Sequence, residues 1–138
     1  MAPLFPAHGK YSIYRDDHIL VTEVIGPWNR ELVQEWSNAA IPFCIEMHQE
    51  GPWVAVAIAS QSMLATPDAM QVLRKIVQIS VEQFDCRAHV VVAGPEVDGR
   101  GLLEPVFEKA YEGLCASGFF DDYDSAKRWA EQLLSQNR

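Results

Sequence analysis

The chain has 138 residues, of which 49% are hydrophobic and 22% charged, as expected for one globular domain with a sizeable core. Eleven basic and 19 acidic side chains give a formal net charge of −8, which disfavours nucleic acid and anionic membrane surfaces as partners. Cys44, Cys86 and Cys115 are too widely spaced for a metal or disulfide pattern, and the sequence lacks both a signal peptide and a membrane-spanning run. We therefore expect a cytoplasmic protein.

The N-terminal third predicts a β-hairpin followed by a long helix. Residues 1–9 contain two prolines and read as a loose leader. Residues 11–14 and 19–25 predict two strands around a turn at 16–18. Asn29 is a good N-cap, with Trp28 and Val33 placed for a hydrophobic staple. Apolar residues then recur at helical spacing to Met47, although Pro42 should kink the helix or split it.

The middle of the chain predicts two buried strands around a second helix. Residues 53–59 are a continuous apolar run and residues 88–93 are apolar except for His89, as is typical of parallel strands covered on both faces. Thr66-Pro67-Asp68 is an efficient helix start, and the apolar stripe continues to Phe84. The polar loop between the first of these strands and the helix lies where open α/β sheets usually place their sites.

The last third predicts a flexible loop at 96–101, a helix with Pro105 in its first turn, and a left-handed stop at Gly118. Phe119-Phe120 would form a short strand, and Asp124 would cap a final helix. The order ββαβαβαβα predicts a single α/β domain over 10–138, with a mixed, mainly parallel five-stranded sheet and four crossover helices.

The chain resembles the SpoIIAA-like family, the group that includes STAS domains. Four features carry the resemblance: the leading hairpin, Gly26-Pro27-Trp28-Asn29, Thr66-Pro67-Asp68-Ala69, and Phe119-Phe120-Asp121-Asp122 before a terminal helix. The resemblance implies a β-α superhelix and a bacterial regulatory or interaction module without enzymatic activity.

The phosphorylation motif of the anti-sigma antagonists in that family is altered in this chain. Their Asp-Ser-Ser-Gly motif falls on Ala65-Thr66-Pro67-Asp68, so that Thr66 takes the position of the phosphorylated serine. Ala65 replaces the aspartate and Asp68 the glycine. Thr66 is thus the phosphoacceptor-equivalent position, but a helix cap explains it better, since Asp68 would repel a phosphate.

We expect the binding residues, if the domain binds a partner, to lie in the loop and helix start after the third strand. Ser60 and Ser62 could bind a ligand or satisfy loop amides. Met63 and Leu64 are the apolar side chains expected to be exposed there. The candidate binding residues are Ser60, Ser62, Met63, Leu64, Thr66 and Asp68.

Other reactive side chains have simpler explanations, and we expect no catalytic, metal or cofactor site. Cys44 and His48 are spaced i, i+4, but Cys44 falls on the apolar stripe. His89 lies inside a valine-rich strand. Asp121, Asp122 and Asp124 lack the pattern of a calcium loop and suit a turn with a cap.

Three functions remain open from the sequence. The first is a module that binds a protein partner or a second copy of itself. The second is a carrier of a small apolar or lipid-like ligand, for which the tryptophans and methionines could line a pocket. The third is a thiol enzyme that uses Cys44 or Cys86, which no motif supports. We favour the first.

Overall fold

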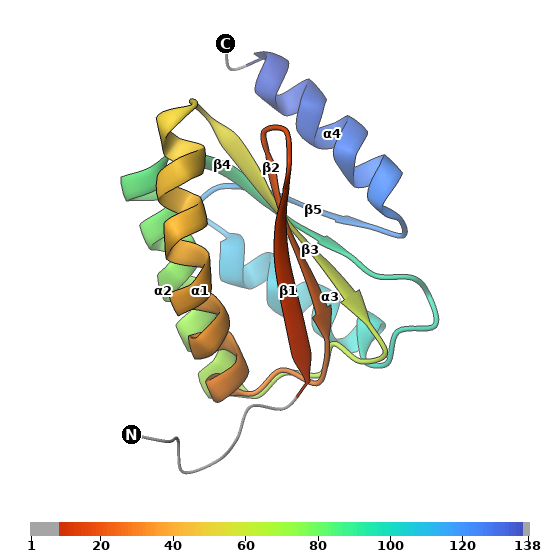
Figure 1. Ribbon diagram of the computed structural model, residues 1–138. Coiled ribbons are helices and arrows are strands. Elements are labelled where there is room, and N and C mark those ends of the chain that lie inside the picture. The colour runs from red at the N-terminus through yellow and green to blue at the C-terminus, as the bar shows by residue number, and fades with distance from the viewer. Residues whose placement is uncertain (1–8, 137–138) are drawn as a thin grey trace.

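The protein forms a five-stranded sheet with helices on both faces, as the computed structural model, which describes residues 9–136, shows (Figure 1). The predicted leader lies outside the described residues except for Gly9, and no helix within 9–136 has the length and apolarity to cross a bilayer. The elements in chain order are β1 (Lys10–Asp16), β2 (Ile19–Ile25), α1 (Arg30–Gln49), β3 (Trp53–Ser60), α2 (Pro67–Phe84), β4 (Cys86–Val92), α3 (Arg100–Tyr111), β5 (Ala116–Phe120) and α4 (Tyr123–Gln136).

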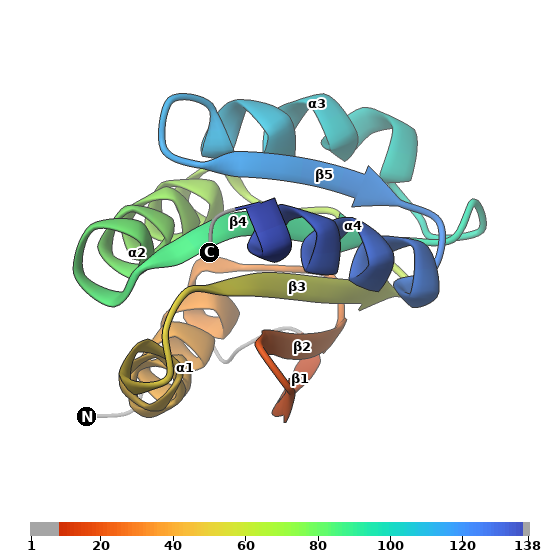
Figure 2. The ribbon, with the colours of Figure 1, turned by 90° about the horizontal axis from the view of Figure 1, so that it is seen from above.

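The strands lie side by side in chain order, β1-β2-β3-β4-β5. β1 pairs antiparallel with β2 as a hairpin, and the other neighbours pair parallel, with Val56 opposite Val90 in the centre. The predicted order of elements and the mixed, mainly parallel sheet are confirmed. α1, α2 and α3 connect successive parallel strands, whereas α4 follows the last strand (Figure 2).

The central strand β3 presents side chains of different size to the two helical layers. Val54 and Val56 pack in a cluster with Ala126, Ala130 and Leu134 of α4. Ala55, Ala57 and Ala59 point the other way, toward the layer of α1, α2 and α3. Successive strand residues face opposite sides, so the valine–alanine alternation makes the first face bulky and leaves space on the second.

The structure corrects the predicted end of the third helix. Gly118 is not a helix stop, because α3 ends at Tyr111 and Gly118 lies within β5, paired with Val90. Gly113 has the left-handed conformation, with φ of +78°. Leu114 continues the helical spacing of Leu103, Phe107 and Ala110, but it lies in the turn before β5. An apolar residue in a turn can fall at the same spacing as the apolar residues of the preceding helix. The pattern therefore predicted an end of the helix that lies too late in the chain.

Two other local predictions are wrong, and one of the two outcomes expected of Pro42 is excluded. Asp122, not Asp124, caps α4, since its Oδ1 accepts a hydrogen bond from the Ser125 amide at 2.8 Å. Pro105 is in the second turn of α3, because the helix begins earlier, at Arg100. Pro42 does not split α1, which is one continuous helix of 20 residues; packing of its apolar face stabilises it on both sides of the proline.

His89 is a buried polar residue of β4 and packs between α2 and α3. Its ring stacks on Tyr111 with centroids 5.5 Å apart, and its Nε2 lies 2.9 Å from Ser80 Oγ. The single Ser80 hydroxyl proton is donated to the Val77 carbonyl at 2.7 Å, so His89 Nε2 carries the proton that Ser80 accepts. Burial lowers the pKa of His89 from 6.5 to about 4.

This depressed pKa predicts a loss of stability in mild acid. Between pH 6.5 and about 4 the unfolded state binds a proton at His89 and the folded state does not. As far as His89 is concerned, the free energy of unfolding is therefore at its full value above pH 6.5. It falls by on the order of 3 kcal/mol as the pH approaches 4. Urea unfolding of the wild type and of His89→Phe, which keeps a ring on Tyr111, measures it. Equal pH slopes for the two proteins between pH 6.5 and 4.5 would refute this assignment.

Candidate functional site

The connections that follow β2, β3, β4 and β5 meet at one edge of the sheet, called here the carboxyl edge. The loop after β3, residues 61–66, lies between the other connections. The Trp28 amide donates to the Leu64 carbonyl at 2.7 Å, and the Thr66 amide donates to the Trp28 carbonyl at 3.2 Å. These bonds extend the parallel pairing beyond the strands, so that the loop is connected to the start of α1.

A second pair of bonds joins the same loop to the connection after β4. The Met63 amide donates to the Asp98 carbonyl at 2.9 Å, and the Asp98 amide donates to the Gln61 carbonyl at 3.0 Å. The segment 96–101, predicted to be a flexible loop, is therefore held in place by its backbone. Composition alone suggested flexibility, because the groups that pair with Asp98, the Met63 amide and the Gln61 carbonyl, belong to a distant segment of the chain.

The two candidate serines satisfy nearby backbone groups. Ser62 Oγ accepts a hydrogen bond from the Leu64 amide at 3.2 Å, and Ser60 Oγ donates to the Val24 carbonyl at 3.4 Å. Both contacts stabilise the connection after β3. The structure thus supports the loop-stabilising interpretation over a ligand contact for these two residues.

The two apolar residues of the loop have opposite environments. Met63 was expected to be exposed, but the structure buries it completely, at 0% exposure, among Val24, Trp28 and Val97. The bond of its amide to Asp98, which the sequence does not reveal, fixes this inward direction. Leu64 is 38% exposed, and this prediction is confirmed.

Leu64 borders a shallow apolar pocket of about 230 Å³ on the carboxyl edge. The sequence did not predict that the connection after β2 helps to line this pocket. Leu64 also lies against Gly99, where a Cβ atom would come within 2.6 Å of Leu64 Cδ2 and where φ is +81°, so the backbone conformation favours glycine there. The pocket is lined by Pro27, Trp28, Asn29, Leu64, Ala65 and Thr66.

Thr66 is the N-cap of α2, and its hydroxyl is fully engaged. Thr66 Oγ1 accepts from the Ala69 amide at 3.3 Å and donates to the carboxylate of Asp68. This hydrogen bond from Thr66 is the main cause that lowers the pKa of Asp68. A phosphate on Thr66 would be repelled by that carboxylate. The geometry therefore supports the interpretation of Thr66 as a helix cap rather than as a phosphoacceptor.

The carboxyl edge is strongly acidic. Lys10, at the start of β1, lies at this edge too, and Arg100 is paired with Asp121. The acidic side chains in the four connections and the first turns of their helices are Glu31, Asp68, Glu96, Asp98, Asp121, Asp122 and Asp124, against Arg30 and Arg100 as the basic ones.

The reactive side chains singled out from the sequence lie apart from one another or are buried within residues 9–136. Cys44 is buried on the apolar face of α1, where burial raises the pKa of its thiol to about 11, while His48 is exposed. Burial also raises the pKa of the Cys86 thiol. Ser80 and His89 are only 3% and 7% exposed, which keeps this serine–histidine pair from solvent. Within residues 9–136, no three metal-ligating side chains come together.

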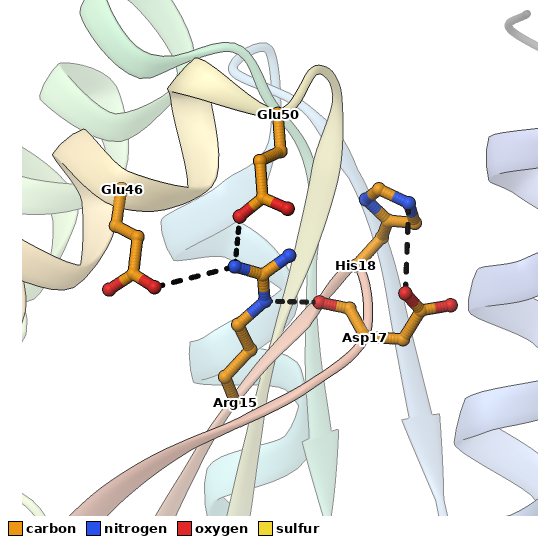
Figure 3. Close-up of polar contacts among 5 residues, drawn as sticks. All are labelled: Arg15, Asp17, His18, Glu46 and Glu50. Carbon is orange, nitrogen blue, oxygen red and sulfur yellow. Dashed lines mark hydrogen bonds and ion pairs between the residues drawn. The ribbon is translucent and has the colours of Figure 1, made fainter.

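The charged cluster at the opposite end of the sheet has a structural role. Arg15 of β1 donates to the Asp17 carbonyl at 2.7 Å and contacts Glu46 and Glu50 of α1 (Figure 3). The hydrogen bond to Glu50 is the largest cause that raises the pKa of Arg15. His18 lies 3.7 Å from Asp17 in the turn. The cluster fastens the hairpin to the end of α1.

The cap of α2 yields a prediction about redundancy. The Ala69 amide donates a hydrogen bond to Thr66 Oγ1 and another, at 2.9 Å, to Asp68 Oδ1. Thr66→Ala alone should therefore cost only about 0.5 kcal/mol of unfolding free energy, at the low end for a cap. The double variant Thr66→Ala, Asp68→Ala should lose more unfolding free energy than the sum of the two single changes. Strict additivity in a denaturant double-mutant cycle would contradict a shared cap.

Comparison with known proteins supports the architecture. No protein-family model matches the sequence, and no curated protein matches it. Among solved structures, the chain is similar to an uncharacterised protein of the DUF3478 family with a SpoIIAA-like fold from Shewanella loihica PV-4. The two share 16% identity and a TM-score of 0.53, over 94% of this chain and 98% of the other. The chain has the SpoIIAA-like fold.

Proposed function

We propose that this protein is a non-enzymatic, cytoplasmic interaction module that binds a protein partner through its carboxyl edge. One observation carries the proposal: Leu64 is held exposed beside the apolar pocket by backbone bonds on both sides of its loop. A loop whose backbone is already fixed loses less conformational entropy on binding, which suits a contact within an interface.

The charge of the carboxyl edge favours a basic partner. Seven acidic side chains lie in the four connections of this edge and the first helical turns that follow them, against three basic side chains at the edge, Lys10, Arg30 and Arg100, and Arg100 pairs with Asp121. A second copy of the chain would bring two acidic edges together, which costs free energy. Self-association through this edge is thus less favourable than binding of a protein with a basic surface around an apolar side chain.

Carriage of a lipid-like ligand receives less support from the geometry. Pockets for small organic ligands usually have volumes of about 300 to 1,000 Å³. The cavity between the sheet and the helices α1 and α2 has about 40 Å³, far too little for an acyl chain. The helices and the sheet pack too closely for this second function.

The interaction module is tested by charge substitution at Leu64. Leu64→Asp should weaken capture of the partner roughly tenfold or more while leaving the fold intact, since Leu64 is 38% exposed. Ile45→Asp is the matched control, because Ile45 is 46% exposed on α1 and outside the pocket. Met63 is unsuitable, since a charge there would disrupt the core.

The measurement is quantitative affinity capture from the native host, followed by titration of the partner at low and high salt. Capture by the wild type and Ile45→Asp, loss with Leu64→Asp, and weaker binding at high salt would support the module. Equal capture by all three proteins, or no specific partner for any of them, would overturn it.

A further inference from the structure

The face of the sheet that packs on α4 is covered only in part. Among residues 9–136, α4 packs across β3, β4 and β5, and the hairpin of β1 and β2 lies to one side of it (Figure 2). On the opposite face α1 covers the hairpin, and Trp36 Nε1 of α1 donates to Thr22 Oγ1 of β2 at 2.9 Å. Within this part of the chain, one side of the hairpin therefore has a helical layer and the other side has none.

The strand register identifies the side chains on the uncovered side, called here the hairpin face. Val21 of β2 packs in the cluster of α4, so Glu23 and Ile25 lie on the same side of the strand. Residues directly opposite each other in an antiparallel pair share a face of the sheet. The hairpin face consists of Lys10, Ser12, Tyr14, Glu23 and Ile25, with Ile58 of β3 next to them.

The hairpin face is unusually apolar for a surface in contact with solvent. Tyr14 is 41% exposed and Ile25 is 38% exposed, whereas the solvent side of an antiparallel sheet is normally polar. Both lie beside Glu23, because Tyr14 donates to its Oε1 at 3.4 Å and Ile25 is two residues along the strand. Ile58, which is half-buried, is the partner of Glu23 on β3. Adjoining exposed apolar side chains of this kind mark contact surfaces.

The charges of the hairpin face balance, although the whole chain has a formal net charge of −8. Asp16, on the same side at the end of β1, is bound by Lys127 at 3.0 Å and by Tyr123 at 2.6 Å. The charged side chains of the face itself are Lys10 and Glu23, which have opposite signs. A strongly basic or strongly acidic partner would therefore gain little net attraction here.

We propose that the hairpin face binds a second copy of the chain and forms a two-fold symmetric dimer. In such a dimer the same surface meets itself, so that surface must be complementary to itself in charge. A two-fold axis midway between Lys10 and Glu23 places Lys10 of each copy opposite Glu23 of the other. Tyr14 and Ile25 are then buried between the copies. The hairpin face includes none of the residues that line the apolar pocket, so the inference does not depend on the docking function of the carboxyl edge.

Charge reversal tests the dimer, and the measurement is analytical ultracentrifugation of the full chain over a micromolar to millimolar concentration range. We expect the wild type to form a dimer that dissociates on dilution. Lys10→Glu and Glu23→Lys should each weaken dimerisation roughly tenfold or more, because symmetry repeats each like-charge contact twice. The double variant Lys10→Glu, Glu23→Lys should restore the dimer, because it exchanges the two charges without removing the pair.

A second variant tests the apolar part of the face independently of the charges. Ile25→Asp should also weaken dimerisation, since it buries a carboxylate without a partner. Leu102→Asp is the matched control, because Leu102 is 71% exposed on α3 and lies outside the hairpin face. Circular dichroism and urea unfolding show whether each variant keeps the wild-type fold, which is expected because the substituted positions are exposed.

The outcomes separate this surface from other modes of association. Weaker dimers in both single reversals and in Ile25→Asp, recovery in the double reversal, and an unchanged dimer in Leu102→Asp would support the proposal. A wild type that stays monomeric over the whole range would overturn it. So would equal dimerisation of all variants, which would place the contact elsewhere, for example at the free edge of β1. A double reversal that dimerises no better than the single ones would equally contradict the pairing of Lys10 with Glu23.

Discussion

The need to pair backbone amides governs the arrangement of the carboxyl edge. Four hydrogen bonds, two on each side of the loop 61–66, connect it to Trp28 and to Asp98. Each bond joins segments that are distant in sequence, so the strand order β2-β3-β4 is continued by the loops themselves. The positions of Met63 inside and Leu64 outside follow from this pairing, because neighbouring residues on an extended segment point in opposite directions.

The same alternation on β3 determines the two helical layers. Valine and isoleucine on one face pack against α4, whereas the alanines leave the cavity on the other face. The signal was present in the sequence as the alternation Val-Ala-Val-Ala-Ile-Ala over residues 54–59. Reading the run only as apolar on both faces predicted a buried parallel strand correctly but did not predict where the layers would pack less densely.

Sequence reasoning succeeded where the physical signal is local. The strand runs, the apolar helical stripes and the caps at Asn29 and Thr66 predicted the order of elements, and both caps form the expected hydrogen bonds. It failed where the local conformation depends on a partner that is distant in the chain. The loop at Asp98 is rigid because Met63 and Gln61 bind it. Likewise, β5 begins at Ala116 because β4 pairs with it. The apolar pocket was missed for the same reason, since Pro27 and Leu64 are far apart in the chain.

Backbone hydrogen bonds between the loops hold the carboxyl edge rigid, and amide hydrogen exchange reports on this rigidity residue by residue. The amides of Trp28, Met63, Thr66 and Asp98 all donate to carbonyls of other segments. Their exchange should be slowed by on the order of 100-fold or more relative to unprotected amides, approaching that of the β3 amides. Exchange at the unprotected rate at Met63 and Asp98 would mean that the loops move independently, and the account of a preformed contact surface would be contradicted.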